Sequence, residues 1–170
     1  MWCSDRRRLL LMLGGLTALS ACGFRPLYGE DSPEQALRGR LAVGKITHGT
    51  LPDRLGFRLA EALRSGIGEG GTPQYRIDAD VTVTEFGLAI TPDNATTRYN
   101  LTGTANWSLT PLAGSQPVMK GVAESHTAYS ATASVYATRI ARRDAESRLG
   151  RALAERILIQ IAARAEEIAG

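Results

Sequence analysis

The feature that most constrains the fold is a long region, residues 75–129, in which apolar and polar residues alternate. The alternation is clear over residues 75–83 and 99–109 and weaker over residues 118–129. A period of two places successive side chains on opposite faces of a β-strand, so each segment predicts a half-buried strand. Turn-forming residues near Pro92 and Pro111 separate the segments. The sequence therefore predicts three consecutive strands joined by short turns.

The first of these strands changes phase partway along. Its apolar residues alternate as far as Val83, and the pattern then resumes one position out of step with Phe86, Leu88 and Ile90. An extra residue inserted into one strand of a pair produces such a shift. We therefore predict a bulge or bend near Thr84-Glu85.

Apolar residues at three- and four-residue spacing predict two helices. The first covers Leu51–Ile67 and ends in a glycine-rich stretch, and the second runs from about Val135 to Ile168. A short candidate strand, Arg40–Thr47, precedes both. The order is β-α-β-β-β-α. The predicted fold class is α+β, with two layers: a four-stranded mixed sheet and two helices packed on one of its faces.

The N-terminus has the pattern of an export signal. Arg6–Arg8 form a positive segment, Leu9–Ala18 form a short apolar run, and the small residues Ser20 and Ala21 precede Cys22. These are the marks of a secretory signal peptide, and the apolar run is too short to span a bilayer. The sequence Leu-Ser-Ala-Cys resembles the bacterial lipobox, in which cleavage precedes a cysteine whose sulfur is then acylated.

This pattern divides the chain into three parts. We expect residues 1–21 to be the signal peptide, residues 22–38 the lipidated N-terminus and tether, and residues 39–170 the folded domain. Gly23 rather than Asp follows the cysteine, which favours sorting to the outer membrane over retention at the inner one. The expected location is the outer membrane, lipid-anchored on the periplasmic side.

The cysteine and charge content argues against a disulfide-stabilised fold and against nucleic-acid binding. The chain has two cysteines, and Cys3 would leave with the signal peptide, so Cys22 would have no intramolecular partner for a disulfide. The net charge of +3 overstates the basic character of the mature domain, because three arginines also leave with the signal. The composition therefore gives no reason to expect nucleic-acid binding.

Catalytic patterns find little support in the sequence. The two histidines, His48 and His126, have no cysteine or carboxylate at metal-ligand spacing. The segment Gly66–Gly71 matches G-x-G-x-x-G, but a dinucleotide site needs a strand before it and a helix after it. Here the predicted order is the reverse, so the glycines are interpreted as a helix stop. We expect no enzyme activity, no catalytic residues, no metal and no cofactor.

The segment Cys22-Gly23-Phe24-Arg25-Pro26-Leu27-Tyr28-Gly29 resembles the start of mature lipoproteins of the LptE family, in its alphaproteobacterial form. The order of the predicted elements is similar as well. The resemblance implies a plug inside the large outer-membrane β-barrel LptD, which the lipoprotein helps to assemble. It also implies binding of lipopolysaccharide and a part in its insertion into the outer leaflet. The implied partners are therefore an LptD-type barrel, lipopolysaccharide and, through the N-terminal lipid, the membrane.

Four arginines are candidates for contacts with lipopolysaccharide phosphates. Arg98 begins the second long strand, and Arg139, Arg142 and Arg143 cluster at the start of the last helix. The planar guanidinium group binds phosphate through paired, charge-assisted hydrogen bonds. The alternative is a solvated helix face on which neighbouring acidic residues, Asp144 and Glu146, neutralise the cluster.

Two other functions remain open at this point. The chain is alternatively a lipoprotein of another envelope complex, such as a lipid-transport auxiliary or the barrel-assembly machinery. The less favoured alternative is a lipid-anchored periplasmic enzyme. If the plug interpretation holds, the polar strand faces and the Arg/Glu-rich last helix should contact a polar barrel lumen.

Overall fold

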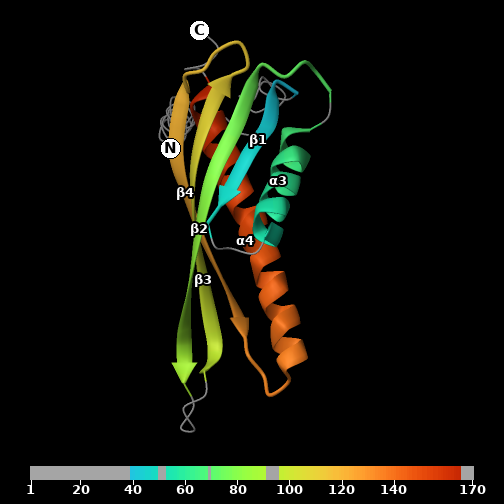
Figure 1. Cartoon of the computed structure of the whole chain (residues 1–170), viewed down its shortest axis with the longest axis vertical. Helices are drawn as coiled ribbons and strands as arrows, with labels where there is room; N and C mark the ends of the chain where they lie inside the picture. Colours follow the sequence, from blue (N-terminus) through green and yellow to red (C-terminus); the bar gives the residue numbers. More distant parts are fainter. Residues whose placement is uncertain (1–38, 50–52, 69, 91–95, 166–170) are drawn as a thin grey trace, which may run out of the picture.

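The computed structural model describes residues 39–49, 53–68, 70–90 and 96–165, which form one two-layer α+β unit (Figure 1). Cys22, the signal peptide and the tether lie outside these residues. The elements follow the predicted order, and their bounds are β1 Leu41–His48, α3 Asp53–Ile67, β2 Tyr75–Ile90, β3 Thr96–Pro111, β4 Met119–Ser130 and α4 Val135–Ala163.

Within the described residues the four strands form a single mixed sheet in the order β1-β2-β3-β4. Strand β1 pairs with β2 in parallel, and the β2–β3 and β3–β4 pairs are antiparallel. Both helices lie on the same side of the sheet (Figure 1). The predicted fold class is therefore confirmed, and the opposite face of the sheet carries no helix among the described residues.

The bulge or bend predicted near Thr84-Glu85 is misplaced, because β2 has its irregularity a few residues farther along. Pairing of β2 with β3 runs without interruption from Tyr75 to Gly87, and the register shifts only between Gly87 and Ile90. Glu85 therefore stays in phase with the inward-facing residues, opposite the buried Leu101. Phe86 and Leu88 fall on the outer face and are largely exposed. The phase of the strand is kept because the inward Glu85 has partners elsewhere in the fold, as described below.

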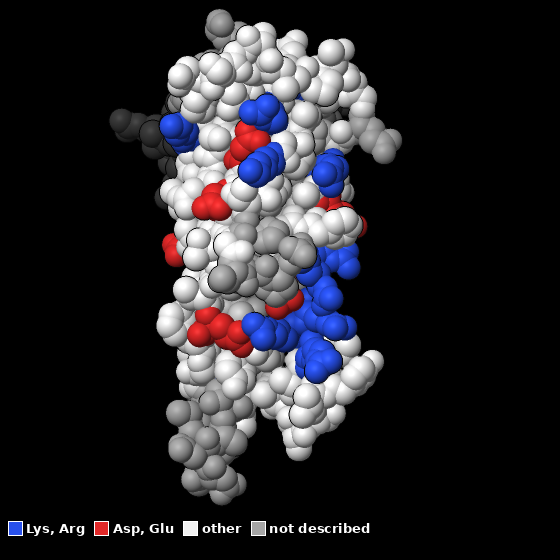
Figure 2. All heavy atoms as spheres, in the orientation of Figure 1, with Lys and Arg blue, Asp and Glu red and all other residues white. Residues whose placement is uncertain are grey.

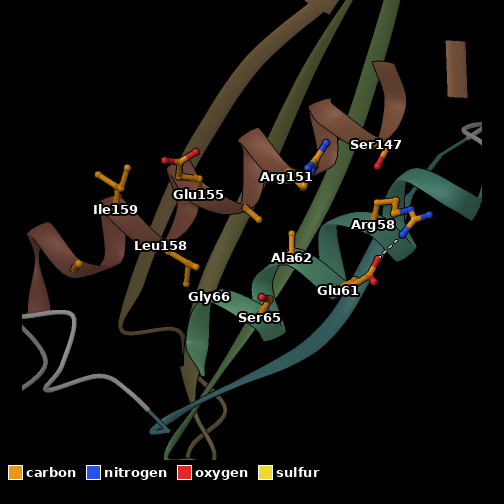
Figure 3. Close-up of a pocket in the computed structure, with 12 residues that line it drawn as sticks. Arg58, Glu61, Ala62, Ser65, Gly66, Ser147, Arg151, Glu155, Leu158 and Ile159 are labelled. Carbon is orange, nitrogen blue, oxygen red and sulfur yellow. Dashed lines mark hydrogen bonds and ion pairs between the residues drawn. The ribbon is translucent and has the colours of Figure 1, made fainter. Parts of the chain in front are cut away.

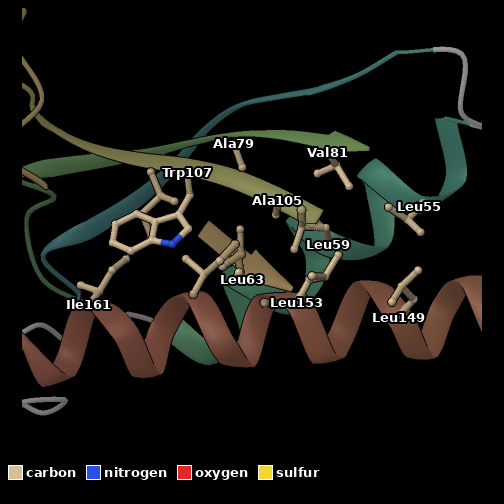
Figure 4. Close-up of a cluster of buried hydrophobic side chains, with 14 of the residues drawn as sticks. Leu55, Leu59, Leu63, Ala79, Val81, Ala105, Trp107, Leu149, Leu153 and Ile161 are labelled. Carbon is tan, nitrogen blue, oxygen red and sulfur yellow. The ribbon is translucent and has the colours of Figure 1, made fainter. Parts of the chain in front are cut away.

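A set of branched apolar residues from both helices and the sheet fills the space between the layers (Figure 4). We call it the leucine core, and its main members are Leu55, Leu59, Leu63, Ile77, Val81, Leu149, Leu153 and Ile157. Each of these side chains is almost completely removed from solvent. Burying a leucine-sized side chain stabilises a fold by about 1.5–3 kcal/mol, so this core is the main apolar contribution.

Two glycines allow the layers and strands to pack closely. A Cβ atom at Gly103 would lie 3.1 Å from side-chain carbons of both Leu149 and Leu153, so the bare backbone lets α4 approach β3. Gly121 lies opposite Trp107 across β3 and β4, and a Cβ atom there would overlap the indole ring. Trp107 is buried, as its place in the alternating pattern predicts, and it donates a hydrogen bond to Gln160.

Side chains of α4 also cover the outer edge of the sheet, where β4 has no further strand beside it among the described residues. Arg148 donates to the carbonyl oxygen of Ala128 at 3.1 Å, and Gln160 donates to that of Val122 at 3.0 Å. Arg164, just past the helix, donates to the carbonyl oxygen of Lys120 at 3.1 Å. Backbone acceptors along this edge are thereby satisfied by side chains of the same chain.

Candidate functional site

The four predicted arginines lie at one end of the molecule. Arg139, Arg142 and Arg143 occupy the first turns of α4, which begins after the N-cap residue Ser134. Arg98 is near the start of β3, at the same end (Figure 1). Basic side chains gather along the side of the molecule where α4 begins (Figure 2). The four arginines differ in what surrounds them.

Arg142 is part of a charged cluster between α4 and the sheet. Its guanidinium group lies 2.8 Å from a carboxylate oxygen of Glu85 and 3.3 Å from one of Glu146. The Tyr129 hydroxyl donates a hydrogen bond to Glu85, and the Tyr129 ring stacks on Tyr99 with 5.2 Å between centroids. We call these five residues the charged end. One cation thus joins two carboxylates from different elements and fixes the start of α4 against β2.

Burial raises the pKa of the Tyr129 phenol above its ordinary value of 10.0, and the hydrogen bond to Glu85 raises it further. The phenol therefore remains a proton donor throughout the neutral range. Glu146 is the more buried of the two carboxylates, at 10% side-chain exposure against 26% for Glu85. A buried carboxylate needs a partner, and Arg142 supplies it. Arg142 therefore contributes to the fold as well as to surface charge.

Arg98 lies on the other side of α4, at a small polar pocket of about 260 Å³ that Tyr129, Ser130 and Arg148 also line. Arg148 is engaged by Asp144 at 2.9 Å and by the carbonyl oxygen of Ala128. Within the described part of the chain, the Arg98 side chain forms no ion pair or hydrogen bond. Its exposed guanidinium group is thus available to an anion.

Arg139 and Arg143 are exposed, and neither forms an ion pair with any residue that the structure describes. They are one helical turn apart and therefore share one side of α4. The structure thus separates the predicted set: Arg142 is shared with two carboxylates, whereas Arg98, Arg139 and Arg143 keep their guanidinium groups toward solvent.

A groove between α3 and α4 is a feature that the sequence did not predict (Figure 3). Its cavity volume is about 640 Å³. Small or apolar residues from both helices line much of it: Ala62, Gly66, Ala154, Leu158, Ile159 and Ala162. Charged residues lie along its rim: Arg58, Glu61, Arg151 and Glu155. The sequence feature that could have revealed the groove is the set of small residues on α3 and α4. Taken alone, such residues indicate only a helix.

The described part of the chain contains no group of three or more side chains that could hold a metal ion. Nor does any helix there combine the length and the apolar character that crossing a bilayer requires. Three surface features of the described residues stand out: the exposed arginines, the groove and the helix-free face of the sheet.

Comparison with known proteins matches the folded domain to a family model. The model for LptE, described as lipopolysaccharide-assembly, matches residues 39–161. No curated protein matches the sequence of this chain.

Solved structures share the fold at low sequence identity. A protein from Caulobacter crescentus CB15 is 21% identical with a TM-score of 0.57, covering 77% of this chain and 93% of that one. Rare lipoprotein B from Shewanella oneidensis is 13% identical with a TM-score of 0.54, covering 76% of this chain and 100% of that one. A minor lipoprotein from Acinetobacter baumannii is 16% identical with a TM-score of 0.53, covering 75% of this chain and 94% of that one. At these identities the structures establish the fold alone.

Proposed function

The chain belongs to the LptE family of lipopolysaccharide-assembly proteins, and from this premise we propose that it is an outer-membrane lipoprotein that plugs an LptD-type β-barrel. In this role it helps the barrel to assemble and assists insertion of lipopolysaccharide into the outer leaflet. Lipid on Cys22 anchors it, and residues 22–38 tether the domain to the periplasmic side of the membrane. The proposed role is one of binding and assembly and includes no chemical step.

The observation that carries the plug proposal is the polar, helix-free face of the sheet. Along the middle of β2 and β3 the outward residues are mainly short and polar: Asp78, Asp80, Thr82, Thr102, Thr104, Asn106 and Ser108. On the same face β4 carries longer polar side chains, among them Lys120 and Glu124, and the apolar Phe86 and Leu88 lie beyond this stretch, toward the end of β2. No helix of the described chain covers them (Figure 1). The interior of outer-membrane barrels is polar, so such a face suits contact with a barrel lumen.

We further propose that Arg98, Arg139, Arg142 and Arg143 contact lipopolysaccharide phosphates. Three of them are exposed and have no carboxylate partner in the described residues. Arg142 is 48% exposed in spite of its two ion pairs, so one edge of its guanidinium group still meets solvent. Phosphate groups on lipid A are the matching anions.

Site-specific photocrosslinking in cells tests the plug proposal. A crosslinking residue at Thr104 or Asn106 should capture an LptD-type barrel, and a tag at the C-terminus should recover the same barrel. Depletion of the lipoprotein should leave misassembled barrel and less lipopolysaccharide on the cell surface. Crosslinks from the tether alone, for example from Tyr28, would count against a plug. Recovery of another envelope complex would support the alternative role in lipid transport or barrel assembly.

A charge-matched pair of variants tests the phosphate contacts. The variant Arg98→Gln/Arg139→Gln/Arg143→Gln should bind lipopolysaccharide more weakly, whereas Arg54→Gln/Arg64→Gln/Arg156→Gln should bind it like the parent protein. Both lose three charges from exposed positions, so a general electrostatic effect would weaken binding equally. Arg142 is left in place because removing it disturbs the charged end. Equal affinities for the two variants would rule out a specific role for these arginines.

A further inference from the structure

The groove between α3 and α4 has the chemistry of a site for an amphiphile. Ala154 and Ala162 are nearly buried at its base, with Ala62 and Leu158 half-buried beside them. Ile159 adds an exposed apolar side chain at the rim. The lining between Ser147 and Ala162 follows α4 for about 22 Å at 1.5 Å per residue. The result is a long, narrow, largely apolar trough open to solvent along one side.

The trough exists because the residues along it are small. Ala62, Gly66, Ala154 and Ala162 contribute little or no side-chain volume between the two helices. Gly150 allows a close contact between the helices, since a Cβ atom there would lie 3.2 Å from the backbone of Leu59. Farther along, the Leu158 side chain packs against Gly66, where an added Cβ atom would lie 2.3 Å from its Cδ1, so Leu158 forms the floor of the groove there (Figure 3).

The charged residues around the trough differ between its two ends. Arg151 lies at the end nearer the start of α4 and forms no ion pair with any described residue. Arg58 is already held by Glu61 at 2.7 Å, and Glu155 lies one turn beyond Arg151. An anionic group is therefore attracted at Arg151, whereas the carboxylate of Glu155, one turn farther along α4, repels it there.

A row of neighbouring side chains on α4 links the trough to the exposed arginines. Residues four apart on a helix are neighbours on its surface, so Arg139, Arg143, Ser147 and Arg151 form a row that winds about a third of the way around the helix axis. The last two line the trough, and the first two belong to the proposed phosphate contacts. A ligand with phosphates on a head group and long apolar chains would match this row and the trough together.

We propose that the groove between α3 and α4 holds an acyl chain of lipid A, with a lipid A phosphate at Arg151. This inference rests on the proposed function in lipopolysaccharide assembly and adds a site to it. The apolar trough removes acyl methylenes from water, and the row of arginines receives the head group. The binding is non-covalent and needs no movement of the leucine core.

The first test is photocrosslinking of the full lipoprotein in cells. A crosslinking residue at Ser65, on the wall of the groove, should form an adduct with lipopolysaccharide. The matched control is Ala163, an exposed alanine of α4 that does not line the groove, and it should form little or none. A second probe at Arg143 reports on the exposed arginines, and recovery of the barrel through the C-terminal tag reports on the proposed function.

The second test fills the groove. Ala62→Phe should reduce the Ser65 adduct by about tenfold, because displacing about two methylenes from apolar contact changes affinity by that factor. Ala163→Phe adds the same side chain at a position outside the groove and should leave the adduct unchanged. Arg151→Gln should also reduce it. The thermal unfolding midpoint of each purified variant establishes that it is folded.

The outcomes separate the groove from the proposed function. Lipopolysaccharide adducts at Arg143 with normal barrel recovery, but none at Ser65, would overturn the groove proposal and leave the function standing. Adducts at Ser65 with phospholipid or with the barrel itself would overturn it in the same way. If the barrel is not recovered and neither probe captures lipopolysaccharide, both proposals are wrong.

Discussion

Helix α4 meets the sheet through two different kinds of contact along its length. Its later turns lie on the leucine core, where Leu149, Leu153 and Ile157 are completely buried. Its first turns meet the sheet through the charged end, where Arg142 joins Glu85 and Glu146. Residues at the very start, including Val135 and Tyr136, are 74% exposed.

The two kinds of contact differ in how much they stabilise the fold and in how strictly they fix its geometry. Apolar contact is non-directional and scales with buried area, so the leucine core dominates the free energy of folding. Partly exposed ion pairs contribute less energy but impose a specific geometry. The charged end therefore sets where the start of α4 lies, and with it the position of the exposed arginines. Changes at one region should leave the other largely intact.

The largest expected effect is in the leucine core. Leu153→Ala should lower the free energy of unfolding by about 2–5 kcal/mol, because it removes buried methylenes and leaves a cavity. Leu112→Ala, at a half-exposed loop position, is the control and should change it by less than about 0.5 kcal/mol. Urea denaturation of both variants measures this. Similar losses for the two would remove the distinction between core and surface.

Loss of the cation at the charged end should cost less. Arg142→Met should lower the free energy of unfolding by about 1–3 kcal/mol, since Glu146 would stay buried without its partner. Hydrogen exchange should speed up over residues 135–146 and remain slow over residues 149–161. Adding Glu85→Gln and Glu146→Gln should recover part of the loss. Uniformly faster exchange along α4 would show that the two regions are one cooperative unit.

Tyr129 provides a pH-dependent comparison. Tyr129→Phe should lower the free energy of unfolding by about 1 kcal/mol at pH 7, because the hydrogen bond to Glu85 is lost. The pKa of the phenol is raised in the folded state above 10.0. The folded state thus binds that proton more tightly, and the stability present below pH 10 is lost as the pH rises beyond it. Thermal unfolding between pH 7 and 11 should show the difference between parent and variant shrinking above pH 10. If the unfolding midpoints of the parent and the variant changed in parallel with pH, the raised pKa of Tyr129 would be contradicted.

The smallest effect is expected at the helix cap. The Ser134 hydroxyl accepts a hydrogen bond from the backbone of Ala137 at 3.3 Å. Ser134→Ala should lower the free energy of unfolding by about 0.5 kcal/mol, at the low end for such caps because the site is exposed. Ser115→Ala, in the exposed turn before β4, is the matched control. A loss as large as that of Leu153→Ala would mean that the start of α4 contributes more to stability than its contacts indicate.

Local periodicity predicted the framework well. The alternating segments became β2, β3 and β4, and the apolar face expected for the last helix became part of the leucine core. Trp107 falls on the apolar side of the alternating segment 99–109, and it is buried. These predictions succeeded because a residue's face in a strand or helix depends on its neighbours in sequence.

Two features could not be predicted in this way. A phase change near Thr84-Glu85 was predicted because Phe86 and Leu88 fall out of step with the earlier apolar residues, whereas in the structure Glu85 faces inward. Its partners, Tyr129 and Arg142, are far away in the sequence, so no local pattern reveals them. The groove was missed for a similar reason. It depends on small residues of two helices facing each other, and this pairing exists only once the chain has folded.

The covered edge of β4 affects how readily the folded domain associates with other polypeptides. An exposed edge strand is a template on which another polypeptide can add a strand, and this is a common start of aggregation. Arg148, Gln160 and Arg164 occupy carbonyl groups that an incoming strand would use. The folded domain gains resistance to self-association from these three side chains.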